Sequence, residues 1–300
     1  MKLFPESAIM QLEFDKVKAL LTAHCQTAYA KHKAANLRVH TRIDFIEPEL
    51  RQSNEYKQLL QNGQYFPNDA VFNLSQELKL LGIPGAVLSG EQFSEIRKLA
   101  ESMRHVFHWF DADRKVSYPA LLRVIANSYY EKNITLLINE VLDELGIVKD
   151  TASKELAQIR TNLARKRAEL RRVFDKVVAK WNKSGYVSDI EEAFLNGRRV
   201  VAVHAEYKRQ VKGILLGESD TRKTSFIEPD ETIELNNDVF ALEHEESREV
   251  YRILRDLTQK LSVHAPLLKD YHTITGEYDF IRAKAKLAID TDGHYPLVHD

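Results

Sequence analysis

Residues 151–182 read TASKELAQIRTNLARKRAELRRVFDKVVAKWN, and this stretch decides the fold. Its apolar side chains recur at steps of three and four residues, the period of one face of an α-helix. They are Leu156, Ile159, Leu163, Leu170, Val173 and Val177, with Lys166 at one position of the seam. At about 1.5 Å per residue the helix is roughly 45 Å long, more than a compact domain usually requires. We therefore expect it to project.

A second long helix is predicted from Pro229 and Asp230 to about Ser262. Its apolar seam is Val239, Val250, Ile253, Leu257 and Leu261. Residues 151–183 carry ten Lys or Arg against three Asp or Glu, whereas residues 231–260 carry four against eight. These opposite charges favour an antiparallel pair, although exposed ion pairs contribute only tenths of a kcal/mol each and apolar burial dominates. The basic helix is thus balanced by its acidic neighbour, and direct DNA contact by this helix is the minority interpretation.

Between the two helices lies the most strand-like stretch, residues 195–230. It contains RRVVAVHAEYKRQVKGILLGESDTRKTSFIEP, residues 198–229, in which β-branched and aromatic residues alternate with turn-forming clusters. This predicts three or four short antiparallel strands. Seven cations stand here against five acidic residues, and we predict that they bind nucleic-acid phosphates: Arg198, Arg199, Lys208, Arg209, Lys212, Arg222 and Lys223. A solvated loop with ordinary lysines is the alternative. No aromatic stripe indicates base stacking or sequence-specific readout.

The remaining sequence predicts a helical core. Helices are expected over residues 8–37, 46–62 and 73–82, and Ser89 with Gln92 forms a capping-box pattern before a helix to about Phe110. Pro119 stands near the start of another. Residues 138–150, INEVLDELGIVKD, indicate a small hairpin or an irregular excursion, and Ser188 with Glu191 forms a second capping-box pattern.

Composition agrees with a mainly α fold. The 300 residues are 44% hydrophobic and 29% charged, with a net charge of -1 and only 11 Gly and 8 Pro. The single cysteine, Cys25, cannot form an internal disulfide and is interpreted as a small buried hydrophobe. The first residues lack the basic and apolar regions of a signal peptide, and no window approaches the ~18 uninterrupted apolar residues of a membrane span. These features predict a cytoplasmic protein.

Catalytic and metal-binding patterns are missing from the sequence. The stretch from Gly213 to Thr224 lacks the Gly before Lys that a Walker A phosphate loop needs. His-x-x-x-His spacing and a G-x-S-x-G elbow are absent, and His204 is the one histidine placed where it could face a phosphate. Two Phe-x-Glu matches, at residues 4–6 and 93–95, are too loose to indicate mismatch recognition. We therefore predict no catalytic residue and no metal ligand in this chain.

Several motifs resemble the MutS-like ATPases, specifically the second bacterial branch, which suppresses recombination and lacks a mismatch-recognition domain. The resemblance covers nearly the whole chain. It is carried by LEFDKVKALL at 12–21, DELGIVKDTAS at 143–153 leading to Leu156, Ile159 and Arg160, NGR at 196–198 through Val203, AEY at 205–207, FIEP at 226–229, ELNN at 234–237 and DFIRAKAKLA at 279–288. Where the family has a Gly- and Ser-rich turn before FIEP, this chain has Thr221 to Thr224.

The resemblance implies a set of domains: a helical core (1–127), an ascending lever (128–194), a β clamp (195–230), a descending lever (231–264) and a return to the core (265–300). It further implies that the full-length protein binds duplex or branched DNA, uses ATP and Mg²⁺ in a domain beyond residue 300, forms a homodimer, and in many members carries a nuclease domain. Members that act on collided ribosomes make a ribosome-associated factor the alternative. A coiled-coil scaffold without nucleic-acid affinity is the third interpretation.

Overall fold

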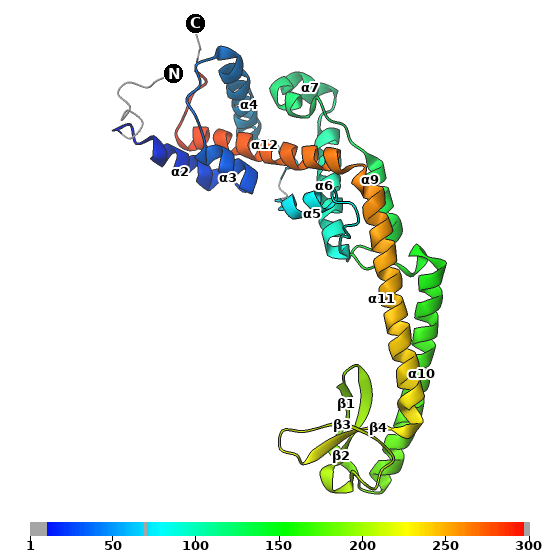
Figure 1. Ribbon diagram of the computed structural model, residues 1–300. Coiled ribbons are helices and arrows are strands. Elements are labelled where there is room, and N and C mark those ends of the chain that lie inside the picture. Colours follow the sequence, from blue (N-terminus) through cyan, green and yellow to red (C-terminus); the bar gives the residue numbers. More distant parts are fainter. Residues whose placement is uncertain (1–10, 69–70, 297–300) are drawn as a thin grey trace. The chain divides into compact units, whose positions relative to one another are not determined.

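The computed structural model describes residues 11–68 and 71–296, so the Phe-x-Glu match at residues 4–6 lies outside it. The chain divides into two compact units, one built from residues 1–147 and 254–300 and the other from residues 148–253 (Figure 1). The fold is mainly α with one small antiparallel sheet, as predicted. The finer division into core, levers and clamp stays a prediction.

The first unit is helical and is organised around its last helix, α12 (Ala265–Asp290). This helix contacts α2, α3, α4 and α6, and α4 lies on the opposite side of it from α2 and α3 (Figure 1). Tyr271, Tyr278 and Phe280 are its largest fully buried side chains. The described residues of this unit also form α2 (Phe14–His24), α3 (Ala28–Ala35), α4 (Ile43–Gln61), α5 (Ser75–Leu80), α6 (Gly90–Trp109), α7 (Ala112–Ser117), α8 (Pro119–Leu122) and α9 (Lys132–Val141).

The single helix expected over residues 8–37 is wrong, because the described part is broken into α2 and α3. Asp279 of α12 accepts hydrogen bonds from the backbone N–H groups of Gln26 (2.8 Å) and Thr27 (2.7 Å), and the Thr27 hydroxyl caps α3. The buried carboxylate thus replaces the helical partners of these amides. Leu12 and Leu20 of the predicted apolar face are more than half exposed.

The predicted capping box at Ser89 and Gln92 is confirmed at the start of α6. The stretch after α9, predicted as a small hairpin or an irregular excursion, is a short turn closed by a hydrogen bond from the Asp143 N–H to the Ile147 carbonyl oxygen at 3.0 Å. Arg97 donates to the carbonyl oxygens of Asp143 and Glu144, both at 2.9 Å. Gly146 contacts Gly90 so closely that a Cβ on Gly90 would lie 1.9 Å from the Gly146 carbonyl oxygen. Side chains are therefore excluded from both positions.

The second unit consists of two long helices and the sheet between them in sequence. After a 3₁₀ turn, Asp150–Ala152, it contains α10 (Lys154–Lys183), β1 (Val187–Leu195), β2 (Arg198–His204), β3 (Gly213–Glu218), β4 (Thr224–Pro229) and the start of α11 (Ile233–Ser262). The capping box predicted at Ser188 and Glu191 is wrong, because both residues lie in β1, in the stretch between Val187 and Glu192 where its register with β2 shifts.

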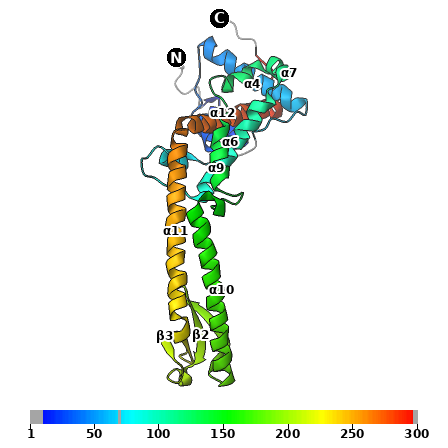
Figure 2. The ribbon, with the colours of Figure 1, turned by 90° about the vertical axis from the view of Figure 1, so that its right-hand side faces the viewer.

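Helices α10 and α11 run antiparallel and side by side (Figure 2). Their common seam contains Leu163, Leu170 and Val239, all buried. Four ion pairs between described residues join them: Arg160 to Glu246 at 2.7 Å, Lys166 to Asp238 at 2.8 Å, Arg167 to Glu243 at 2.6 Å and the looser Arg252 to Glu155 at 4.0 Å. The predicted pairing of a basic with an acidic helix is thus confirmed. Beyond Leu170, the buried positions of α10 are Phe174, Val177 and Trp181, and Val173 is only partly buried.

The sheet has the order β1-β2-β4-β3 with every neighbour antiparallel. One face packs on α10 through Val201, Val203 and Ile227, which meet Phe174 and Trp181. The sheet is curled: a Cβ on Gly217 of β3 would lie 3.0 Å from the Leu195 side chain of β1, although β2 and β4 lie between these two strands in the sheet. Register shifts interrupt both edge strands, between Val187 and Glu192 and between Leu215 and Gly217.

Among the described residues, no helix is both long and apolar enough to cross a membrane.

Candidate nucleic-acid interface

A buried carboxylate fixes the sheet to the start of α11. Glu228 is 1% exposed and accepts hydrogen bonds from the Arg198 guanidinium (2.7 Å) and the Asn236 amide (2.8 Å). Arg198 also donates to the Asn237 side chain. A buried charge is tolerated only when it is paired and hydrogen-bonded, and here both conditions hold. The NGR, FIEP and ELNN motifs therefore meet in one cluster, which orients the sheet.

Arg199 is also committed to internal contacts. Its side chain is 10% exposed and lies 2.7 Å from Glu192. The guanidinium stands 4.9 Å from the Phe174 ring centroid and 5.7 Å from that of Phe194, a cation–π arrangement with both rings. Phosphate binding by Arg198 and Arg199 stays a prediction, and their internal partners favour a structural role.

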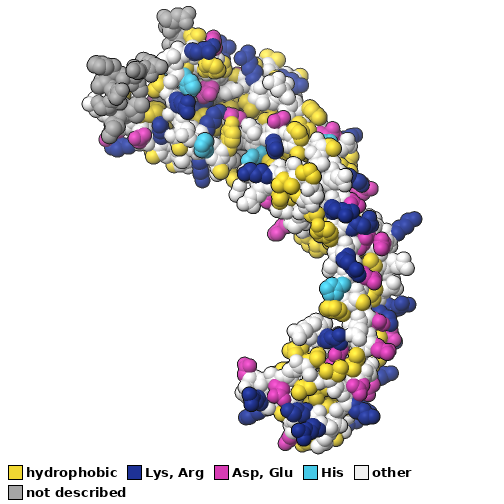
Figure 3. Space-filling model, viewed as in Figure 1, with side chains coloured by type: hydrophobic (Ala, Val, Ile, Leu, Met, Phe, Trp, Pro, Cys, Tyr) yellow, Lys and Arg dark blue, Asp and Glu magenta, His cyan; other side chains and the backbone are white. Residues whose placement is uncertain are grey.

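The remaining five predicted cations lie on the two loops that flank β3. Lys208 pairs with Glu218 at 2.7 Å, and this hydrogen bond lowers the pKa of the Glu218 carboxyl. Within the described residues no ion pair is found for the other four, whose side chains are exposed: Arg209, Lys212, Arg222 and Lys223. Figure 3 shows Lys and Arg side chains over the part of the second unit that contains the sheet, with hydrophobic side chains between them.

Backbone pairing brings three of these four cations to one end of the sheet. The Ala205 N–H donates to the Lys223 carbonyl oxygen, and the His204 N–H donates to that of Tyr186, just after α10. The loop that bears Arg209 and the turn that bears Arg222 therefore leave the sheet at the end where α10 finishes. Lys212 lies at the other end, where its carbonyl oxygen accepts from the Asp230 N–H. His204 pairs with Thr224 across the strands and is half-buried.

Arg222 occupies a strained position in its turn. Its φ is 56°, in the left-handed region that glycine adopts freely and other residues adopt at a cost of about 1–2 kcal/mol. This is the turn where the family pattern has Gly and Ser. The chain therefore places an exposed cation where a relaxed backbone would favour glycine.

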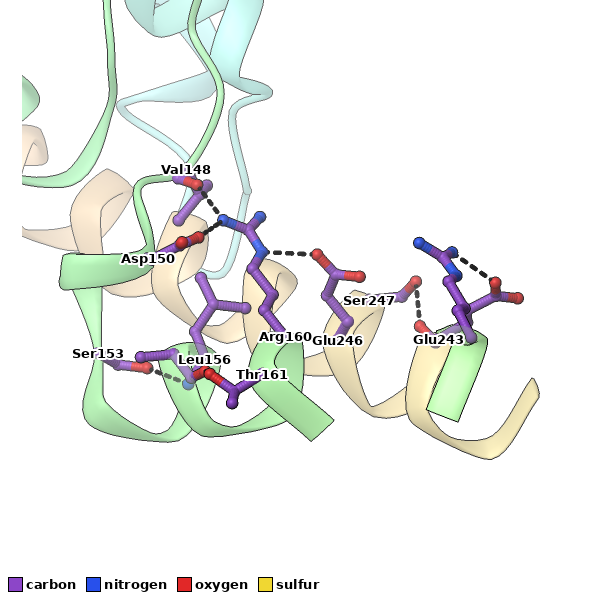
Figure 4. Close-up of polar contacts among 11 residues, drawn as sticks. Val148, Asp150, Ser153, Leu156, Arg160, Thr161, Glu243, Glu246 and Ser247 are labelled. Carbon is purple, nitrogen blue, oxygen red and sulfur yellow. Dashed lines mark hydrogen bonds and ion pairs between the residues drawn. The ribbon is translucent and has the colours of Figure 1, made fainter. Parts of the chain in front are cut away.

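The DTAS part of the sequence motif forms a second polar cluster, at the start of α10 (Figure 4). Arg160 donates to the Val148 carbonyl oxygen at 2.8 Å and bonds Asp150 and Glu246. Burial opposes the guanidinium charge, but these two carboxylates raise the Arg160 pKa. Ser153 caps α10 and donates to Glu249 of α11, whose pKa is lowered chiefly by its hydrogen bond with Arg252.

Other candidate groups take structural positions. Cys25 is buried, and burial raises the pKa of its thiol to about 11. Phe93 of the second Phe-x-Glu match is fully buried in α6 and cannot enter a base stack. Over residues 11–68 and 71–296, no group of three or more His, Cys, Asp or Glu side chains is arranged to hold a metal ion.

Comparison with curated proteins gives one consistent result. The chain is 30% identical to endonuclease MutS2 of Geobacillus thermodenitrificans over 96% of its length, and 26% identical to endonuclease MutS2 of Aquifex aeolicus over 97%. It is 28% identical to the putative endonuclease MutS2 of Bacillus subtilis over 98%. The chain is related to the MutS2 branch of the MutS-like proteins. The resemblance read from the sequence motifs is thereby confirmed.

The extent of the match also matters. The chain covers 37% of the Geobacillus MutS2 protein and 38% of the Aquifex and Bacillus ones. No protein-family model matches the chain. Any activity of a whole MutS2 protein is therefore a proposal here.

Two features of the site were missed from the sequence. Asn196 and Gly197, with φ of 52° and 77°, form the two-residue turn between β1 and β2, and Asn-Gly is the strongest short signal for such a hairpin. Phe194, two residues earlier, is 69% exposed. Recognising the Asn-Gly turn would have placed Phe194 at the end of a strand opposite Arg199.

Proposed function

We propose that the second unit binds nucleic acid by its phosphates, as the DNA-gripping part of a MutS2-type protein. The observation that carries this proposal is the set of four exposed cations without an ion pair among the described residues, on the two loops that flank β3. A duplex presents regularly spaced phosphates, and each one neutralised releases condensed counterions. Contacts of this kind position a protein without reading sequence.

The other charged groups of the second unit have structural roles. Arg198, Glu228 and Asn236 hold the sheet on α11, so that the loops keep their place during binding. The ion pairs between α10 and α11 occupy three of the basic side chains of α10, so a phosphate could bind these only by displacing a carboxylate. The grip is thus concentrated on the loops.

In the wider protein, we propose suppression of recombination through binding of branched DNA. ATP and Mg²⁺ would act in a domain outside these 300 residues. The two long helices would connect that domain to the sheet, and the Arg160 cluster would fix the start of α10 for this purpose. A preference for branched over linear duplex is the expected signature.

Fluorescence anisotropy with blunt and four-way-branched DNA, at about 50 and 200 mM salt, tests the grip. Changing Arg209, Lys212, Arg222 and Lys223 to Gln together should weaken binding and reduce the salt slope by roughly three to four. The matched control changes four exposed cations of the first unit to Gln: Arg104, Lys115, Lys132 and Lys269. Equal losses in both variants, or binding that does not respond to salt, would overturn the proposal.

A further inference from the structure

A cleft lies where the β1–β2 hairpin meets the two long helices. Its lining includes Arg167, Leu170 and Arg171 of α10, Phe194 of β1, and Asn236 and Val239 of α11. These residues all belong to the second unit. The cleft combines one large exposed aromatic ring with two exposed guanidinium groups, and none of the three has a role in the grip on the loops.

Phe194 is held as a platform. Its partner across the strands is Arg199, whose guanidinium stands 5.7 Å from the ring centroid. Arg199 is itself fixed by Glu192 and by the Phe174 ring beneath it. The Phe194 ring is therefore supported from within the protein while 69% of the residue remains exposed. A flat ligand can stack on it without first ordering the ring.

The two arginines supply an anion site next to this platform. Arg167 and Arg171 are one helical turn apart, so both side chains reach the same side of α10. Arg171 is 70% exposed, and its nearest carboxylate, Asp175, stands at a loose 3.8 Å. Arg167 is bound more closely, to Glu243 at 2.6 Å. An incoming phosphate would meet Arg171 first and would have to compete with Glu243 for Arg167.

We propose that this cleft binds a nucleotide whose base has left the base stack. The base would lie on the Phe194 ring, and its phosphate would be held by Arg171 with help from Arg167. A base within a continuous duplex has no free face, so the occupant is a single-stranded, overhanging or junction nucleotide. This inference rests on the proposed grip and gives it a substrate class, because it explains how a duplex end or branch would be distinguished from plain duplex.

The chemistry fits either DNA or RNA, since both offer a base face and a phosphate. Three probes separate these sources: a blunt DNA duplex, a DNA duplex with a 3′ overhang, and an RNA duplex with the same overhang. A 5-iodouracil base in each overhang forms a covalent bond on irradiation with an aromatic side chain stacked against it. Mass spectrometry then identifies the residue.

The 300-residue chain should bind the overhang about tenfold more tightly than the blunt duplex, the scale of one stacked base. It should also form a crosslink at Phe194. Phe194→Leu should reduce that preference to about one while blunt-duplex affinity is kept. Arg171→Gln should weaken overhang binding several-fold. Ile190→Ala is the matched control, because Ile190 is 65% exposed on the same strand but does not line the cleft.

Each outcome has a defined meaning. A crosslink at Phe194 with one overhang only assigns the site to that nucleic acid. Blunt-duplex binding that is intact, with no overhang preference and no effect of Phe194→Leu, overturns the stacking site and leaves the proposed grip standing. Absence of binding to every probe at low salt overturns both.

Discussion

The two units differ in how their principal helices are stabilised. In α12, 14 of 26 residues are buried, because other helices surround it. In α10, seven of 30 are buried, along one seam. The helix in the first unit is therefore maintained by apolar packing, whereas those in the second rely on a thin seam, ion pairs and two polar clusters. Substitutions in the two units should therefore lower stability for different reasons.

The largest effect should come from the core of the first unit. Tyr278 is fully buried, stands 4.6 Å from Phe66 between ring centroids and donates to the Leu121 carbonyl oxygen. Tyr278→Ala should lower the free energy of unfolding by about 3–5 kcal/mol, because it leaves a cavity and removes the buried hydrogen bond to the Leu121 carbonyl oxygen. Urea denaturation measures this loss. Tyr251→Ala, at a 57% exposed site in the second unit, should change it by less than about 0.5 kcal/mol.

The next effect should come from the polar cluster of the second unit. Glu228→Ala removes the partner of both Arg198 and Asn236 and should cost about 2–3 kcal/mol. Amide hydrogen exchange in β2 and β4 should accelerate accordingly. Glu192→Ala breaks a more exposed pair with Arg199 and should cost under about 1 kcal/mol. Equal costs at the two sites would contradict a structural role for the buried carboxylate.

A smaller, local effect is expected at the start of α10. Arg160→Gln loses the donors to Val148, Asp150 and Glu246, and should lower the free energy of local opening by about 1–1.5 kcal/mol. Exchange of the amides in residues 148–153 should then be about tenfold faster. Arg165→Gln, an exposed change on the same helix, provides the comparison. No acceleration relative to that variant would show that the cluster does not stabilise the turn.

The smallest effect should carry the opposite sign. Arg222→Gly relieves a left-handed backbone and should raise stability by about 0.5 kcal/mol, while it reduces the salt slope of DNA binding by about one. Arg209→Gly removes an equally exposed cation without such relief and should lower stability. Thermal melting measures the stability of both variants, and anisotropy measures their DNA binding. A loss of both stability and DNA binding in Arg222→Gly would contradict the strain assigned to this turn.

Sequence predicted the long helices well because their information is local. The seam from Leu156 to Leu170 repeats with the helical period, and its partner is identified by charge. The break at Thr27 could not be predicted in this way, since the carboxylate that causes it lies some 250 residues further along, at Asp279. Local patterns carry no information about such a partner.

At the candidate site, too, the sequence did not show which residues have distant partners. Charge counting identified Arg199 and Lys212 equally, but only the structure shows that one is sandwiched between aromatic rings and the other is exposed. Ser188 likewise lies in β1 and caps no helix, because this strand pairs with β2 on both sides of it, at Val187 and from Glu192 onward. Burial and pairing depend on distant neighbours, which composition does not specify.

The irregular edges of the small sheet affect its behaviour in concentrated solution. A straight, exposed edge strand invites other chains to extend it, and this is a common route to aggregation. Here β1 is interrupted and carries exposed Asp189, Glu191 and Glu192, while the shift in β3 falls beside Gly217. Neither edge offers a long, flat row of backbone groups. A sheet of four short strands can therefore remain exposed enough to meet a ligand without becoming a template for fibres.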